Sequence, residues 1–495
     1  MVDSRCIASS SFSHLRLQIQ RHTESYPPKA RNQEMNPTIV GFRTSNYLCH
    51  LEQQKPVITR RSYVRKAKKC ICSIEVAEKK KKGTIAGAAA LVIGTSIGSG
   101  ILALPQKASP AGFIPSSTSV IVCWIFLLIE AFLLVEINVG LMRKNEGKEK
   151  DNELKLVSIR TMAQETLGDW GGTLASVVYI FLGYSSMVAY ISKSGEILFQ
   201  LINLPAPVSG CLFTMLFTIL VSIWGTSATD QVNQFLTASM IGLLLAIEVL
   251  AVVFGGWSGV GGISDWTKVP STIPVIIFSL VFHDLAPFLC AYLDGDLRRI
   301  KASIFLGSLV PLAALLVWAA IALGLASEAE QVVDPVKLLS GLRWSGVSLM
   351  VGAFSLLAVG TSLIGTLLSF SEFFKEQLKN ETWRFPSTQK VKGNWWDMNR
   401  MNVTAVTVVV APSLFVSTAF PDAFSAATDI AGGYCMTVLY GVLPPAMVWE
   451  MQKREAEPSG QKEFLSARPA LIVIELFACA IVLEQFLQDI LALQS

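Results

Sequence analysis

Long apolar stretches, separated by short polar loops, dominate the chain from about residue 84 to its C-terminus. An α-helix needs about 20 apolar residues to cross the hydrocarbon core of a bilayer. About eleven stretches have this character, and lipid offers their backbone groups no partners outside a helix. The sequence therefore predicts an all-α polytopic membrane protein of about eleven transmembrane helices. The predicted spans are 84–105, 116–141, 173–201, 208–224, 235–254, 272–293, 302–325, 346–370, 403–420, 425–449 and 469–493.

The charges of the loops predict an orientation in the membrane. If the N-terminus lies inside, the inner loops carry 22 Lys and Arg residues and the outer loops carry four. Positive charges concentrate in the inner loops of membrane proteins. One missing span would move every later loop to the other side and would remove this asymmetry. The charge pattern therefore supports the predicted order of spans.

Composition excludes several classes of function. Only 16% of the residues are charged, whereas soluble domains carry about 25%. The sequence contains no clustered basic face of the kind that binds nucleic acid. It also contains no glycine-rich phosphate loop of the kind found in ATP-driven pumps. The cysteines are scattered, and three of the four histidines (His14, His22 and His50) precede residue 79. We expect no metal, no cofactor and no nucleic-acid partner, while membrane lipid is an expected partner and the oligomeric state stays open.

Residues 1–78 differ from the rest of the chain. Up to Cys70 they contain 13 Lys and Arg against four acidic residues, and serines cluster between Ser4 and Ser13. A basic, serine-rich, acid-poor start without an apolar core is typical of organellar transit peptides. Serine enrichment favours the chloroplast envelope, with the mitochondrial inner membrane as the alternative address. A disordered cytoplasmic tail is the other interpretation of this composition.

Two of the predicted spans contain helix-breaking sequences. The first has three glycines and three hydroxyl residues within Gly94–Gly100, and glycine costs a helix about 1 kcal/mol relative to alanine. The sixth has Phe282, His283 and Asp284 shortly before Pro287, and proline removes a backbone donor and clashes with the preceding turn. Close packing of small residues between helices is the alternative explanation of the glycines.

The two breaks occupy matching places in the chain. They fall in spans one and six, which indicates two repeats of five spans followed by an extra helix. Unwound backbone at membrane depth is tolerated only where it lines a cavity or is buried in protein. We therefore predict a transporter domain at 79–493, with repeat one at 84–254, repeat two at 272–449 and an extra helix at 469–493.

A broken span supplies groups that suit a zwitterion. The amides that begin the half-helix after Gly98 carry positive partial charge and suit a carboxylate, while free carbonyls of the preceding half-helix suit an ammonium group or a cation. This combination fits an α-amino acid. The candidate substrate-binding residues are Gly94, Thr95, Ser96, Gly98, Ser99, Gly100, Phe282, His283 and Asp284, with Phe282, Tyr184 and Tyr190 as apolar walls.

From residue 84 onward the chain resembles the tryptophan/tyrosine permease branch of the hydroxy/aromatic amino acid permeases, within the amino acid–polyamine–organocation superfamily. The resemblance rests on GTSIGSGILALP at 94–105, AGF at 111–113, YISKSGEIL at 190–198 and IPVIIFSLVFHDLAPFLCAYLDGDLRRI at 273–300. It implies a leucine-transporter-like fold with a 5+5 inverted repeat and eleven spans, and import of tyrosine or tryptophan with protons. The basic leader, which the bacterial members lack, favours a plant, plastid-type homologue.

Polar residues within the spans are candidates for ion coupling, because a charge at a helix centre costs about 2.5–3.5 kcal/mol. Asp284 can bind the substrate ammonium or carry a proton, and His283 can relay one. Glu136 is a further candidate. Thr361 and Ser362 match the place where sodium-coupled relatives of this fold hold a cation, although hydroxyls there can instead bond to helix carbonyls.

Two residues in the matched motifs depart from the family pattern. Lys193 and Asp284 stand where bacterial relatives usually carry small or uncharged residues, which leaves the substrate and the coupling stoichiometry open. Lys193 and Glu196 lie three apart on one helical face, so they are expected to neutralise each other.

These observations predict a secondary active transporter of amino acids, most consistent with aromatic substrates, that works by alternating access. A proton is favoured as the coupling ion, and sodium is the alternative. A passive channel and a membrane-embedded enzyme are the competing hypotheses. The enzyme is disfavoured because Asp294 and Asp296 form only one acidic pair, beside two arginines.

Overall fold

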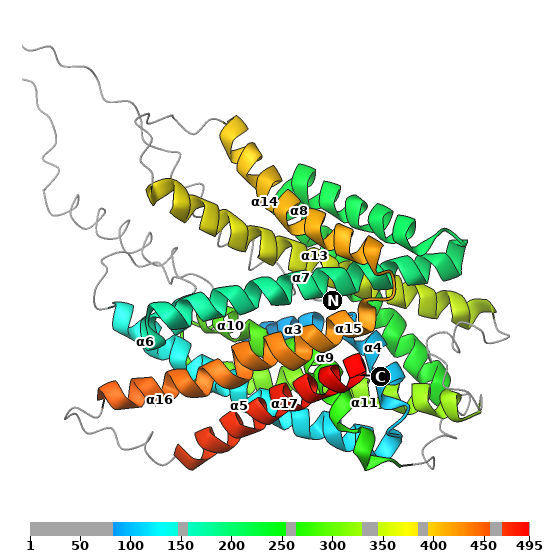
Figure 1. The fold of residues 1–495 in the computed structure, drawn as a ribbon, viewed down its shortest axis with the longest axis horizontal. Helices are drawn as coiled ribbons and strands as arrows, with labels where there is room; N and C mark the ends of the chain where they lie inside the picture. Colours follow the sequence, from blue (N-terminus) through cyan, green and yellow to red (C-terminus); the bar gives the residue numbers. More distant parts are fainter. Residues whose placement is uncertain are drawn as a thin grey trace, which may run out of the picture. The chain divides into compact units, whose positions relative to one another are not determined.

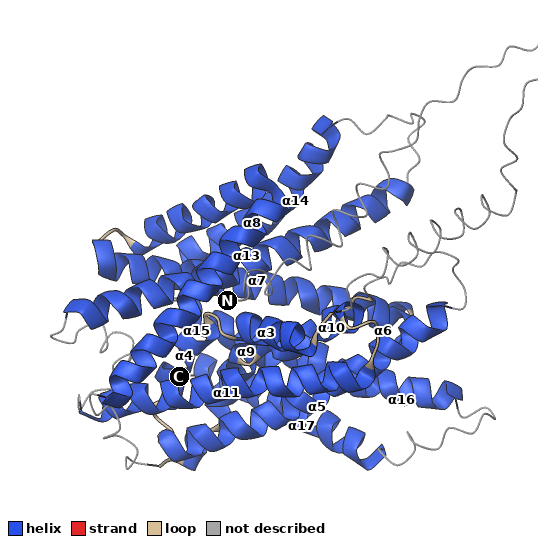
Figure 2. Ribbon diagram, turned by 180° about the vertical axis from the view of Figure 1, so that it is seen from behind, coloured by secondary structure: helices blue, strands red, loops and turns tan. Residues whose placement is uncertain are grey.

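The computed structural model describes residues 83–146, 157–253, 264–328, 345–384, 395–455 and 468–494. Within these ranges the regular structure is entirely helical (Figure 2). The all-α prediction is therefore confirmed for this part of the chain. The predicted leader, residues 1–78, lies outside the described residues.

Figure 1 shows how the described helices are arranged. The α-helices are α3 (Ile85–Ser96), α4 (Gly100–Ala108), α5 (Phe113–Glu146), α6 (Ile159–Leu167), α7 (Asp169–Ile202), α8 (Ala206–Val253), α9 (Ile273–Ser279), α10 (Ala286–Tyr292), α11 (Leu297–Glu328), α13 (Ser345–Arg384), α14 (Trp395–Ala419), α15 (Phe424–Asp429), α16 (Leu443–Glu455) and α17 (Arg468–Gln494). Three short 3₁₀ helices, η2 (Trp266–Lys268), η3 (Pro270–Thr272) and η4 (Val281–Leu285), and a π-helix, η5 (Ile430–Val442), complete the set.

Most of the predicted spans are present as long apolar helices among the described residues. Among the described residues, nine helices are long and apolar enough to cross a membrane, or ten if the bent pair α3 and α4 is one span. Ala206–Ser222 is a further, shorter apolar helix. The predicted number of about eleven is thus not confirmed. One difference is that α8 continues through 225–234, where a loop was predicted, because no proline interrupts the helix there.

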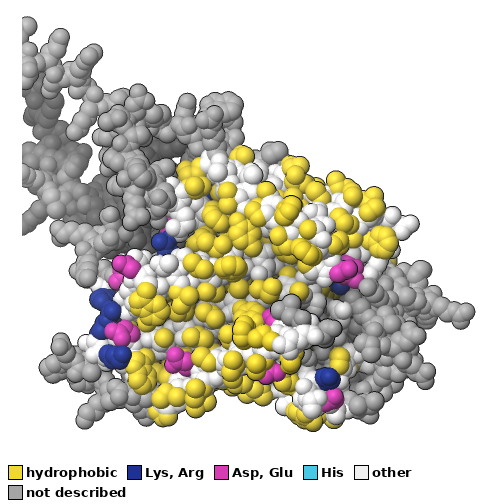
Figure 3. Space-filling model, in the orientation of Figure 1, with side chains coloured by type: hydrophobic (Ala, Val, Ile, Leu, Met, Phe, Trp, Pro, Cys, Tyr) yellow, Lys and Arg dark blue, Asp and Glu magenta, His cyan; other side chains and the backbone are white. Residues whose placement is uncertain are grey.

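The helices form two neighbouring groups. In Figures 1 and 2, α7, α8, α13 and α14 lie together on one side, and α3, α4, α9, α10, α11, α5 and α17 lie on the other. Figure 3 shows an outer surface that is largely apolar, with Lys and Arg towards its margins. Exposed Phe415, Val473 and Leu476 belong to that apolar surface, as expected for a protein surrounded by lipid.

One end of the helices carries a concentration of positive charge. Arg143 and Lys144 close α5 there, and Lys453 and Arg454 close α16. We call this end the basic end. It corresponds to the inner side in the predicted topology.

Both predicted breaks are confirmed. The axes of α3 and α4 differ by 55° across the break at 97–99. The span from 270 to 292 divides into α9, η4 and α10, and Leu280 between α9 and η4 has non-helical angles of φ −101° and ψ 55°. The glycine-rich sequence and the sequence before Pro287 therefore interrupt their helices as expected.

The two broken spans touch through glycine. A Cβ atom placed on Gly100 would lie 2.7 Å from Cα of Ser279 and 3.0 Å from the Phe278 carbonyl oxygen. At the other end of the pair, a Cβ on Gly83 would lie 2.4 Å from the Tyr292 carbonyl oxygen. The first span is thus in direct backbone contact with the sixth on both sides of the breaks.

Gly100→Ala should lower the stability of the protein by about 1–3 kcal/mol, because the added methyl group must displace the backbone of α9. The measurement is thermal unfolding of the purified protein in detergent. Gly242→Ala is the matched control, since a Cβ there meets nothing within 4 Å. Equal melting temperatures for the two variants would contradict the close contact between α4 and α9.

Candidate functional site

The first break leaves several backbone groups without hydrogen bonds. The Ile93 carbonyl accepts from the Ile97 amide. The carbonyls of the next three residues, Gly94, Thr95 and Ser96, accept no hydrogen bond from the described chain. The amides of Gly98 and Gly100 likewise donate none. Donors and acceptors are therefore available a few residues apart, as predicted for a site that binds both ends of an amino acid.

Helix α13 supports the break from the other helix group. The Ser99 amide donates to Oγ of Ser362 at 3.1 Å, and a Cβ on Gly98 would lie 2.8 Å from the same oxygen. The neighbouring Thr361 hydroxyl donates to the Ala358 carbonyl at 3.1 Å. Of the two hydroxyl candidates for a cation site, Ser362 thus holds the break and Thr361 bonds back to its own helix.

The second break carries a cluster of aromatic and acidic side chains. The Tyr440 hydroxyl of η5 donates to Oδ1 of Asp284 at 2.5 Å. The His283 ring is fully buried and lies 4.6 Å from the Tyr440 ring. Tyr179 of α7 also interacts electrostatically with Asp284. The sixth span, η5 and α7 therefore meet at Asp284.

The side chains around the breaks are exposed on one side only. Thr95, Asp284 and Ser369 are exposed, as is Gly365, one turn before Ser369 on α13. Ser369 also hydrogen-bonds with Tyr179, which connects it with Asp284. Polar side chains at this depth face protein or water rather than lipid. We call these exposed positions the vestibule residues, and we expect them to face water.

On the opposite side of the breaks the chain is closed. Ser99 is 1% exposed, Phe278 4% and Ser279 6%. Beyond them, Lys107 at the end of α4 pairs with Asp429 of α15 at 2.6 Å. Exposed and buried residues are thus both present around the breaks, and the Lys107–Asp429 pair joins α4 to α15.

The predicted aromatic walls separate into two places. Tyr190 is buried, lies 6.1 Å from the Phe278 ring and hydrogen-bonds with Ser99, so it belongs to the first break. Phe282 is fully buried beside His283. Tyr184 instead packs against Phe370 and donates to the Val408 carbonyl at 2.9 Å, so its contacts are with α13 and α14.

Two further predicted polar residues are engaged in ion pairs. Glu136 of α5 pairs with Lys301 of α11 near the basic end. The buried Lys193 pairs with Glu196 at 2.9 Å, as expected from their spacing, and its ammonium lies 5.0 Å from the centre of the Phe424 ring. Glu136 is thus engaged in an ion pair that joins α5 to α11.

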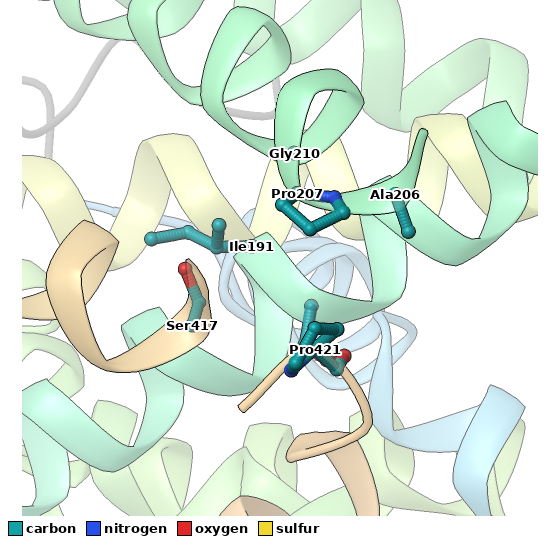
Figure 4. A pocket seen from close by; sticks show the side chains of 7 residues that line it. Ile191, Ala206, Pro207, Gly210, Ser417 and Pro421 are labelled. Atoms are coloured by element: carbon teal, nitrogen blue, oxygen red, sulfur yellow. Dashed lines mark hydrogen bonds between the residues drawn. The ribbon is translucent and has the colours of Figure 1, made fainter. Parts of the chain in front are cut away.

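A small hollow lies beside Lys193 rather than at the breaks. Figure 4 shows its lining from α7, α8 and α14, with Ile191, Gly210 and Pro421 among the labelled residues. Its volume is about 10 Å³, which is room for about one water molecule. It is too small for an amino acid.

Sequence reasoning missed Tyr440 and the pair of Lys107 with Asp429. Tyr440 lies in an apolar stretch that is wound as a π-helix, and this winding directs the Tyr440 side chain to Asp284. No local pattern in the sequence predicts a π-helix there. Lys107 and Asp429 are 322 residues apart. Their only sequence signal is that each is a charged residue at the end of a span.

Comparisons with known proteins identify the family of the chain. A model of the tryptophan/tyrosine permease family matches residues 80–485. The chain belongs to the tryptophan/tyrosine permease family. It is 28% identical to the tyrosine-specific transport system 1 of Haemophilus influenzae, over 75% of this chain and 89% of that protein. It is 24% identical to a tryptophan-specific transport protein of Pseudomonas aeruginosa, over 81% and 94% of the two chains.

A solved structure shows the same fold. The crystal structure of MhsT in complex with L-phenylalanine has a TM-score of 0.55 and 14% identity, and the match covers 80% of this chain and 98% of that one. The leucine-transporter-like fold expected from the resemblance is therefore confirmed. This member of the permease family is an integral membrane transport protein and not an enzyme.

The vestibule predicts the labelling of introduced cysteines. In a variant without native cysteines, Thr95→Cys and Ser369→Cys should react with a membrane-impermeant thiol reagent added from the basic end, because both positions are exposed. Ser355→Cys, on the same helix as Ser369 but fully buried, should stay unlabelled. Reaction of the buried control, or none at the two vestibule positions, would rule out the vestibule.

Proposed function

We propose that this permease carries aromatic amino acids, with tyrosine or tryptophan as substrate, by alternating access driven by a proton gradient. The observation that carries the proposal is the meeting of free amides, free carbonyls and Asp284 at the paired breaks, above an exposed vestibule. The named specificities of the relatives from Haemophilus and Pseudomonas support an aromatic substrate. A related protein of Aliivibrio fischeri named glutamine transporter 2, 23% identical, makes glutamine the competing substrate.

The substrate would be held by its two charged ends. Its carboxylate would accept from the amides of Gly98 and Gly100, where the start of α4 adds positive partial charge. Its ammonium would lie between Asp284 and the carbonyls of Thr95 and Ser96. A charge-assisted hydrogen bond is about twice as strong as a neutral one, so Asp284 is the main ligand of the ammonium group.

The aromatic side chain needs an apolar wall close to these groups. Tyr190 and Phe278 supply one, because their rings pack together next to Ser99. Aromatic pairs prefer offset or edge-to-face contacts with ring centres 4.5–7 Å apart. A substrate ring inserted beside this pair can adopt such a contact, which favours tyrosine and tryptophan over glutamine.

In alternating access, the side that is closed in this conformation would open and the basic end would close. On the closed side the Lys107–Asp429 pair joins α4 to α15. At the basic end the Arg299 guanidinium donates to the Gly83 carbonyl at 2.5 Å and joins α3 to α11. In the opposite conformation the Lys107–Asp429 pair would separate while α3 closes the vestibule.

The engagement of the α13 hydroxyls supports a proton rather than sodium. Sodium needs several oxygen ligands, whereas Ser362 already accepts from Ser99 and Thr361 bonds to its own helix. Asp284 and His283 can both bind a proton and lie at the second break. A channel remains the competing mechanism, and only a transporter accumulates substrate against its gradient.

The test is uptake by proteoliposomes that contain the purified full chain, with a panel of labelled amino acids and with or without a pH gradient. Tyrosine or tryptophan should accumulate when the gradient is present, and sodium should not replace it. Equilibration without accumulation would identify a channel. Preferential uptake of glutamine would overturn the aromatic assignment.

Asp284→Asn in the same vesicles should weaken substrate affinity by about 2–3 kcal/mol, or roughly 30- to 150-fold, while uptake still responds to the pH gradient. Asp294→Asn, after α10, is the matched control and should leave affinity unchanged. Preserved exchange with loss of gradient-driven accumulation would instead make Asp284 the proton carrier. Normal affinity with normal accumulation would leave it a structural polar group.

We also propose that residues 1–78 address the permease to the chloroplast envelope. The support is their basic, acid-poor and serine-rich composition. A fluorescent protein fused after residue 78 should enter plastids, and replacement of Arg5, Arg16 and Arg21 by Glu should abolish import. Mitochondrial fluorescence would overturn the plastid address, and cytosolic fluorescence would overturn the transit peptide as well.

A further inference from the structure

A second acid lies deep in the membrane part of the protein, away from the substrate groups. Glu130, in the middle of α5, is 1% exposed, and neither carboxyl oxygen has a hydrogen-bond partner among the described residues. The other membrane acids considered above, Asp284 and Glu136, have Tyr440 and Lys301 as partners. Among the described acids, Glu130 has both carboxyl oxygens buried without a partner, whereas Glu248 has one such oxygen.

Apolar groups from two other helices lie next to the Glu130 carboxyl group. From η5, Gly441 approaches so closely that a Cβ there would lie 2.7 Å from Oε1 of Glu130. From α17, Ala478 reaches the same point, and the rings of Phe477 and Phe126 pack at 4.9 Å beside it. No basic residue of the described chain interacts with the carboxyl group.

The titratable groups nearest to these contacts supply no positive charge. On α5 itself the Cys123 thiol interacts electrostatically with Glu130. On α17 the acid closest in sequence to Ala478 is Glu475, which is half-buried. On η5 the residue before Gly441 is Tyr440, whose hydroxyl is bonded to Asp284. None of them supplies a positive charge to a carboxylate at position 130.

An ionised carboxylate cannot remain in such a place. Removing a charge from water costs several kcal/mol unless a partner compensates it, and buried groups without one become neutral instead. In this conformation Glu130 therefore carries a proton. Ionisation requires that water reach the carboxyl group, which requires that α5 and η5 separate.

The same helix connects this acid with the substrate site. Tyr440 and Gly441 are adjacent in η5, and the first contacts Asp284 while the second contacts Glu130. π-helical segments are uncommon and often occur at functional sites. A shift of η5 that changes the bond from Tyr440 to Asp284 also changes the space around Glu130.

We propose that Glu130 is a second proton-binding site of the permease, filled in the conformation described here and emptied when η5 moves away from α5. The carboxylic O–H then transfers its proton to an entering water molecule, and the remaining carboxylate is hydrated until it takes up a proton again. This proposal rests on the proton coupling proposed above. It adds a site at which substrate and proton are linked through Tyr440 and Gly441.

The test compares Glu130→Gln with the wild type in proteoliposomes. Glutamine has the shape of the protonated acid and cannot release a proton, so the variant should keep wild-type substrate affinity and counterflow exchange. Accumulation driven by the pH gradient should fall at least about tenfold, a change of about 1.4 kcal/mol. Glu475→Gln, the half-buried acid of α17, is the control and should accumulate substrate normally.

Infrared difference spectra provide a readout that does not depend on transport. Addition of tyrosine to the wild type should change the band of a protonated carboxyl group, and this change should be absent from Glu130→Gln. If Glu130→Gln does not fold, Gly441→Ala, which crowds Oε1, should shift the pH dependence of exchange while the acid is retained.

The outcomes separate this proposal from the proposed function. No gradient-driven uptake by the wild type would overturn proton coupling and, with it, the role of Glu130. Normal accumulation by Glu130→Gln, or an unchanged infrared difference band, would overturn the role of Glu130 alone. Loss of substrate affinity in Glu130→Gln would show that the residue supports the fold of the site and does not exchange protons.

Discussion

The need to satisfy every backbone polar group in lipid determines how this permease is built. Most of the chain meets it with continuous helices, and the exceptions are confined to two short segments that face protein or a vestibule. At 97–99 the α13 hydroxyl of Ser362 satisfies one amide, and others remain free. The free groups would be costly to bury unless water or a ligand bonds to them. The arrangement of the surrounding helices follows from keeping these segments out of lipid.

Much of this architecture could be predicted from the sequence, for identifiable reasons. Hydropathy locates most spans because lipid imposes one solution on an apolar stretch, and Gly98, Gly100 and Pro287 locate the breaks because helix geometry penalises them locally. The pairing of Lys193 with Glu196 follows from their spacing in one helix. The number of spans was less certain, because the polar residues around 225–234 are compatible with both a loop and a helix.

The rest depends on contacts between distant segments, which local patterns do not contain. Tyr440 reaches Asp284 only because η5 is wound as a π-helix, and Glu130 is recognisable only once Gly441 and Ala478 are known to cover it. Tyr184 was expected at the site from its residue type, whereas its contacts lie with α13 and α14. The sequence thus predicts which groups could bind a substrate, and the packing decides which of them meet.

The glycine contacts at the two ends of the broken spans have a mechanical consequence. Gly83 binds α3 to the end of α10, and Gly100 binds α4 to the end of α9, so each half of the first span travels with a half of the sixth. Relative motion of the two halves must then be absorbed at 97–99 and at Leu280, where regular helix is absent. The free groups proposed to bind the amino acid lie in the first of these segments. A bound substrate would therefore restrict the relative motion of the two halves, and the carrier without substrate would be more flexible.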